Sequence, residues 1–178
     1  MKKYYEFVYA QYMESQIYYI HKLINRLTPA LGRLDPEQYF LDSQLLLSLI
    51  TNVANVLDSR RKKERSSHLI TYFDIQLDKI PSIINRDMRN TNEHYDERMD
   101  DFMEESNVIL TQNDIDDVKK LVSVVQTRGL TGYANLDNNC LYSVDRKLNR
   151  IMISLDQVKE ETYYIMQQIN KKRASINP

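Results

Sequence analysis

Three side chains able to do chemistry lie close together between Asn85 and Phe102: Arg89, Asn90 and His94. An imidazole titrates near neutral pH, so His94 could exchange a proton with a reacting group. A guanidinium can hold an anionic group through two parallel hydrogen bonds, and Arg89 offers one. The amide of Asn90 could hydrogen-bond to the imidazole and set its orientation. The spacing therefore suggests acid–base chemistry beside an anion-binding arginine.

The sequence around these residues predicts a helix that begins near Pro81. On a regular helix Asn90 and His94 are neighbours one turn apart, whereas Arg89 is rotated by about 140° from His94. The Arg89 side chain would then lie next to Glu93, so an ordinary surface ion pair is the competing interpretation. The predicted core face of this helix is formed by Ile84, Met88, Thr91, Tyr95, Met99 and Phe102.

The run from Arg89 to His94 resembles the signature of the HEPN superfamily. That signature is an arginine, a polar residue (Asn, Asp or His) beside it, and a histidine separated from the arginine by four to six residues. Members of the superfamily are α-helical bundles with the motif on a late helix. Many HEPN toxins have a tyrosine two positions after the histidine, but this chain has Asp96 there and Tyr95 one position earlier.

The resemblance implies metal-independent cleavage of RNA in a bacterial toxin–antitoxin or defence system, with Arg89, Asn90 and His94 as the catalytic group. A homodimer would bring two motifs together in one cleft, so that Arg89 of one subunit could act with His94 of the other. RNA and an antitoxin or other protein are the implied partners. The alternative is a non-catalytic HEPN-like module that dimerises or binds a nucleotide or a protein.

Charge counts against a dedicated nucleic-acid binder, because a formal net charge of -1 gives the chain no global field that attracts RNA. Between Asp87 and Glu105 there are eight acidic residues, which would repel a polyanion. The dense basic cluster from Arg60 to Arg65 could compensate by binding a phosphate backbone. The competing interpretation is a solvated helix C-terminus, where cations complement the helix dipole. The acidic residues predict no metal site, since they spread around the helix and lack the Glu-x-x-His pairs of helical-bundle metal sites.

The elements that must position this group are predominantly helical. Three glycines and four prolines in 178 residues favour long helices. Apolar periodicity predicts helices over residues 4–31, from Pro36 to Leu57, from Pro81 to Phe102, from Asp114 to Gln126 and from Asp145 to Lys172. The turn residues 137–139 predict a small β-hairpin within residues 130–144. The expected fold is mainly α: one domain over residues 1–178, a bundle of four to five helices with one small β-hairpin.

The remaining sequence features concern the tyrosines of the first helix and the cellular compartment. Six tyrosines in the first helix (Tyr4, Tyr5, Tyr9, Tyr12, Tyr18 and Tyr19) favour packing in a core or subunit interface over a base-stacking platform. The lone Cys140 excludes an internal disulfide and favours a reducing compartment. We find no secretory signal and no apolar run long enough to span a membrane. The expected location is cytoplasmic, with no cofactor, metal or membrane partner.

Overall fold

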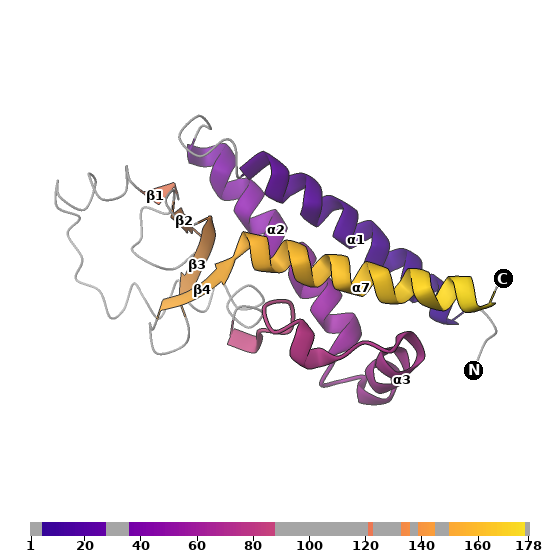
Figure 1. Cartoon of the computed structure of the whole chain (residues 1–178). Coiled ribbons are helices and arrows are strands. Elements are labelled where there is room, and N and C mark those ends of the chain that lie inside the picture. Colours follow the sequence, from indigo (N-terminus) through magenta and orange to yellow (C-terminus); the bar gives the residue numbers. More distant parts are fainter. Residues whose placement is uncertain are drawn as a thin grey trace, which may run out of the picture.

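A computed structural model describes residues 5–27, 36–87, 121–122, 133–135, 139–144 and 150–176. For residues 36–40, 121–122, 133–135, 141–144 and 150–151 it describes the backbone alone. The chain is mainly α, as predicted, and the described ranges contain four α helices and a small sheet. The sheet lies at one end of the helical bundle (Figure 1).

Helix α1 (Tyr5–Leu27) and helix α2 (Pro36–Leu57) form an antiparallel pair. Asn52 donates a hydrogen bond to Gln16, and Arg26 pairs with the buried Asp42 at the other end of the pair. Pro36 is the first residue of α2, as its fixed φ angle predicts. Buried residues occur on more than one side of α2, because its sequence is apolar almost without interruption from Leu45 to Leu57.

Helix α7 (Leu155–Ile176) runs antiparallel to α1 and closes the core (Figure 1). His21 lies 2.7 Å from the Thr162 hydroxyl, while Arg173 forms a hydrogen bond of 2.8 Å with Glu14 near the start of α1. Its buried stripe contains Leu155, Val158, Thr162, Ile165 and Ile169, all of which the sequence pattern predicts. Helix α3 (Lys63–Phe73) packs against α2 and α7, and a 3-10 turn, η1 (Leu77–Lys79), follows it.

The apolar face of α1 differs from the predicted one. Its buried residues are Ala10, Met13, Ile17, Ile20, Leu23, Ile24 and Leu27. Val8 and Tyr12 share the three- and four-residue spacing that predicts this helix, but they are 58% and 41% exposed. The two partners α2 and α7 cover only part of the circumference of α1, so these side chains remain outside the core.

The sheet is larger than the predicted hairpin. It consists of β1 (Leu121–Val122), β2 (Tyr133–Asn135), β3 (Cys140–Val144) and β4 (Arg150–Ser154), all antiparallel in the order β1-β2-β3-β4. Strands β2 and β3 confirm the hairpin. Asn139 at its turn has a φ of 48°, a conformation that asparagine tolerates better than most residues.

Two predicted helices are wrong where they overlap this sheet. Leu121 and Val122 belong to β1 instead of a helix from Asp114 to Gln126. The C-terminal helix begins at Leu155 rather than Asp145, because residues 150–154 pair with β3. Met152 is exposed and Ile153 buried, which is the alternation of a strand. A short apolar run satisfies both periods, so backbone pairing with the neighbouring strand β3 decided its structure.

Within the described ranges, no helix combines the length and the apolar character that crossing a membrane requires. In the same ranges, histidine, cysteine, aspartate and glutamate side chains form no group of three or more that could hold a metal ion.

Candidate functional site

The predicted catalytic residues Arg89, Asn90 and His94 lie outside the described residues. The same holds for Glu93 and for the predicted core face beyond Ile84. The structure does describe the chain up to residue 87, and so it defines the position from which this motif segment departs.

The segment before the motif is a turn, not the start of a helix at Pro81. The buried carboxylate of Glu161 on α7 accepts hydrogen bonds from the backbone N–H groups of Ser82 and Ile83, at 3.0 and 2.8 Å. These two bonds satisfy donors that would otherwise be buried without a partner. They also hold the backbone of residues 81–84 against α7.

Helical structure begins at Arg86, five residues after the predicted start at Pro81. The side-chain oxygen of Asn85 accepts a hydrogen bond of 3.1 Å from the N–H of Asp87, which is the geometry of a helix N-cap. The capping residue is therefore Asn85.

Arg86 connects the start of this helix to the end of α2. Its guanidinium donates two hydrogen bonds to the Asp58 carboxylate, with N–O distances of 3.1 and 3.2 Å. These bonds and the negative charge of Asp58 raise the pKa of Arg86. Asp58 directly follows α2, so the segment that leads to the motif is fixed to α7 on one side and to the α2–α3 turn on the other.

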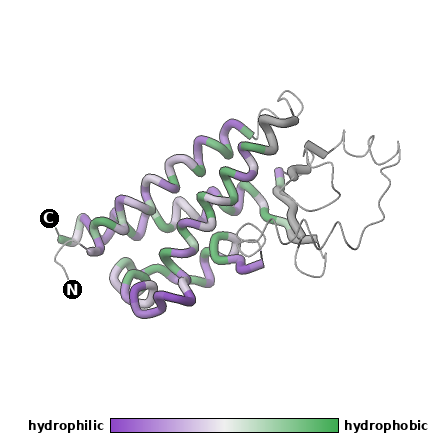
Figure 2. Tube along the Cα trace, turned by 180° about the vertical axis from the view of Figure 1, so that it is seen from behind, coloured by the Kyte–Doolittle hydropathy of each residue, from purple (hydrophilic) through white to green (hydrophobic). Residues whose placement is uncertain are grey.

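The α2–α3 turn carries the basic cluster. Arg60, Arg61, Lys62 and Lys63 are exposed, and together with Tyr5, Glu64 and Arg65 they line an open hollow of about 570 Å³. We call this the cationic hollow. Figure 2 shows the change from the apolar α2 to this strongly hydrophilic turn. None of the four exposed cations forms an ion pair with a residue of the described ranges.

The basic cluster does not offset the negative end of the α2 dipole. The last turn of α2 contains no basic residue, and α2 ends at Leu57, three residues before Arg60. Instead Lys62 and Lys63 stand at the N-terminus of α3, where the helix dipole is already positive. The N-cap residue Lys62 makes no side-chain capping hydrogen bond. The position of these cations raises the local positive potential, which favours an anion.

The turn is held in shape by buried polar contacts. Ser66 is buried; its hydroxyl donates to the carbonyl of Val56 at 2.9 Å and accepts from the N–H of Ser59 at 3.1 Å. Arg65 is anchored as well, because its guanidinium donates to the Asn55 carbonyl and its charged end lies 5.3 Å from the centre of the Tyr9 ring. The exposed cations therefore project from a fixed frame.

Two residues that support this arrangement escaped the sequence analysis. Glu161 is the clearer case, because it falls on the same helical face as Val158 and Ile165, where an acidic residue is unusual. An acidic residue on a core face indicates a buried hydrogen-bonding role. Asp58 gave no such signal, since its partner Arg86 is 28 residues away.

Comparison of the chain with models of protein families, with curated proteins and with solved structures gives no match in any of the three.

Proposed function

We propose that the chain is a HEPN-like protein that binds RNA through the cationic hollow and cleaves it with Arg89, Asn90 and His94. The observation that carries the proposal is the Arg86–Asp58 pair, which joins the start of the motif segment to the turn that bears the hollow. Arg89 follows Arg86 by three positions, and a fully extended chain covers three positions in at most about 11 Å. The cationic hollow is thus joined to the point from which the motif segment departs, which supports the proposal.

The chemistry would need no metal ion. His94 would take the proton of a ribose 2′-hydroxyl or give one to the leaving 5′-oxygen. Arg89 would hold the phosphate as negative charge develops on it, and Asn90 would orient the imidazole or a phosphate oxygen. A homodimer would let Arg89 and His94 act from different subunits, which removes the conflict of their directions on one helix. The cations of the hollow would offset the acidic residues that surround the motif.

The direct test is cleavage of a labelled single-stranded RNA in the presence of EDTA. His94→Ala and Arg89→Ala should each lower the cleavage rate by at least about 100-fold, because each removes a group needed in the transition state. Arg98→Ala is the matched control, since it removes an arginine from the same acidic stretch. Thermal unfolding should be unchanged in all three variants. Full cleavage by either motif variant would refute the assignment.

The exposed apolar residues of α1 favour a second candidate, a non-catalytic dimerisation or protein-binding module. Val8, Tyr12 and Tyr19 lie on one exposed side of α1, at helical spacing. In that case the wild-type chain cleaves no RNA, and the double variant Tyr12→Lys, Tyr19→Lys weakens a dimer in sedimentation experiments. A stable monomer would count against this candidate and also against a catalytic site shared between subunits.

A further inference from the structure

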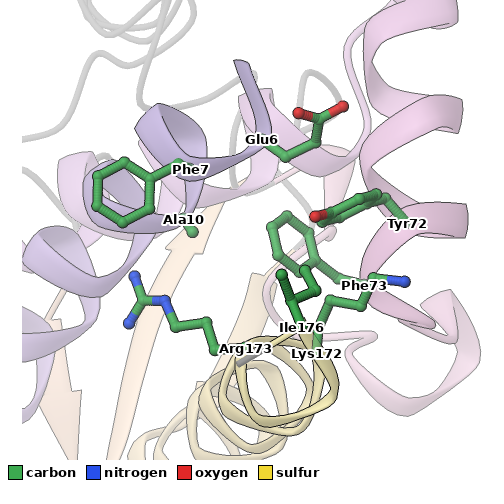
Figure 3. A pocket seen from close by; sticks show the side chains of 8 residues that line it. All are labelled: Glu6, Phe7, Ala10, Tyr72, Phe73, Lys172, Arg173 and Ile176. Atoms are coloured by element: carbon green, nitrogen blue, oxygen red, sulfur yellow. The ribbon is translucent and has the colours of Figure 1, made fainter. Parts of the chain in front are cut away.

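A second pocket, separate from the cationic hollow, lies at the other end of α3. Its volume is about 240 Å³, and it is lined by the first turns of α1, the last turn of α3 and the last turns of α7 (Figure 3). Ala10 and Phe73 form its floor, and each is 2% exposed. Phe7 and Tyr72 stand at its sides. The lining is therefore mostly apolar, in contrast to the hollow.

Three charged side chains also line this apolar pocket: Glu6, Lys172 and Arg173. Arg173 is bound by the Glu14 carboxylate, which offsets its charge. Glu6 lies 2.7 Å from the Nε2 atom of His68. Figure 3 shows Glu6 on the opposite side of the pocket from Lys172 and Arg173.

Of the two cations that line the pocket, Lys172 is the one that forms no ion pair with a carboxylate of the described residues, although Glu6 lines the same pocket. Its Nζ atom lies 4.6 Å from the centre of the Tyr72 ring, a cation–π contact that leaves the N–H donors of the ammonium available. The side chain is half-buried, so an anion beside it would be partly shielded from water. Shielding strengthens an ionic hydrogen bond.

We propose that this pocket binds a small organic monocarboxylate with an aromatic or alkyl body. The body would cover Ala10 and Phe73, and the carboxylate would accept hydrogen bonds from Lys172. A single uncompensated cation fits a single negative charge better than a dianion. An apolar cavity of about 150 Å³ can hold benzene, so about 240 Å³ leaves room for a ring with a short chain. No residue of the cationic hollow takes part, and the proposal goes beyond RNA cleavage.

The test uses 3-phenylpropionate as the probe and 3-phenylpropanol as its uncharged counterpart, each titrated into the whole chain and followed by two-dimensional NMR. The carboxylate should bind saturably with a Kd of about 1 mM or lower, as expected for a ligand of this size. The alcohol should bind at least about 10-fold more weakly, because it lacks the charge. The shifted resonances should include Ala10 and Phe73.

The variant Lys172→Met should weaken binding of 3-phenylpropionate about 10-fold. Lys171→Met is the matched control, because it removes the same charge from the neighbouring exposed position and should leave the Kd unchanged. The catalytic variant His94→Ala should also bind the probe normally, which keeps this proposal independent of RNA cleavage. The proposal is overturned if there is no saturable binding up to about 20 times the expected Kd. Equal affinity for the alcohol, or equal loss in the two lysine variants, would overturn it as well.

Discussion

The two ends of α3 present different surfaces, although the helix is only 11 residues long. At its N-terminus four exposed cations surround an open hollow, whereas at its C-terminus buried apolar side chains form the floor of a smaller pocket with one uncompensated cation. The first surface suits a polyanion held by several screened contacts, and the second suits a small ligand held by burial and one ionic hydrogen bond. Charge density and burial thus differ sharply between the two ends of one short helix.

Reversing the charge of the hollow should have the largest effect. In the triple variant Arg60→Glu, Arg61→Glu, Lys63→Glu, the affinity for single-stranded RNA at low salt should fall by about 1,000-fold, because three phosphate contacts become repulsive. Fluorescence anisotropy would measure the Kd. The affinity for 3-phenylpropionate should not change, which would separate the two ends of α3.

A control with the same change in net charge is available on other elements. Lys22, Lys79 and Lys171 are exposed and lie outside the hollow, so replacing all three by Glu should weaken RNA binding far less. A similar loss in both triple variants would mean that RNA responds to the overall charge of the chain and not to the hollow.

Removing the Glu161 carboxylate should have the next largest effect. Glu161→Ala leaves the buried N–H groups of Ser82 and Ile83 without their acceptor and should lower the free energy of unfolding by about 2–4 kcal/mol. Urea denaturation measures the loss. RNA cleavage should fall as well, since the motif segment loses one of its two attachments, while binding to the apolar pocket persists in the folded protein. The neighbouring exposed Glu160→Ala should change stability by less than about 0.5 kcal/mol.

Ser66→Ala should have a smaller effect, confined to the hollow. Loss of the hydroxyl breaks the contacts with Ser59 and Val56 that hold the α2–α3 turn, at a cost of about 1–2 kcal/mol in unfolding free energy. RNA affinity should drop because the cations lose their fixed frame. Ser67→Ala, at an exposed position, provides the control. Unchanged stability in Ser66→Ala would mean that the turn does not depend on this hydroxyl.

A pH effect on the bundle should be the smallest and should not distinguish the two ends of α3. Burial, and then the charge of Lys159, lower the pKa of His21 below its usual value of 6.5. The unfolded chain therefore binds a proton more readily at His21 than the folded chain does. The contribution of His21 to the free energy of unfolding is fully present above pH 6.5. This contribution should be lost as the pH falls through the lowered pKa. Urea denaturation between pH 7.5 and 5 would detect the change, and His21→Gln should remove this component of it.

Local patterns in the sequence were sufficient for the long helices. The first residue of α2 and the buried stripe of α7 from Leu155 onward follow from a proline and from apolar periodicity. The strands at residues 121–122 and 150–154 were missed, because their apolar runs are too short to distinguish a strand from a helix and pairing with the neighbouring strands decided their structure.

For the candidate site, the sequence identified residue types but not their surroundings. The basic cluster was evident, but its place at the N-terminus of α3 depended on where α2 ends and α3 begins. The pairing of Asp58 with Arg86 and the apolar pocket beside Lys172 depend on contacts between helices that no local pattern encodes.

The pairing of α7 with α1 has a consequence for biosynthesis. Contacts within the α1–α2 pair join residues 16 to 36 positions apart, whereas those between α1 and α7 join residues 134 to 159 positions apart. At typical translation speeds the ribosome takes on the order of 10 s to make the chain between α1 and α7. For that interval the side of α1 that α7 later covers is open to chaperones, so the core cannot be completed before the C-terminal helix is synthesised.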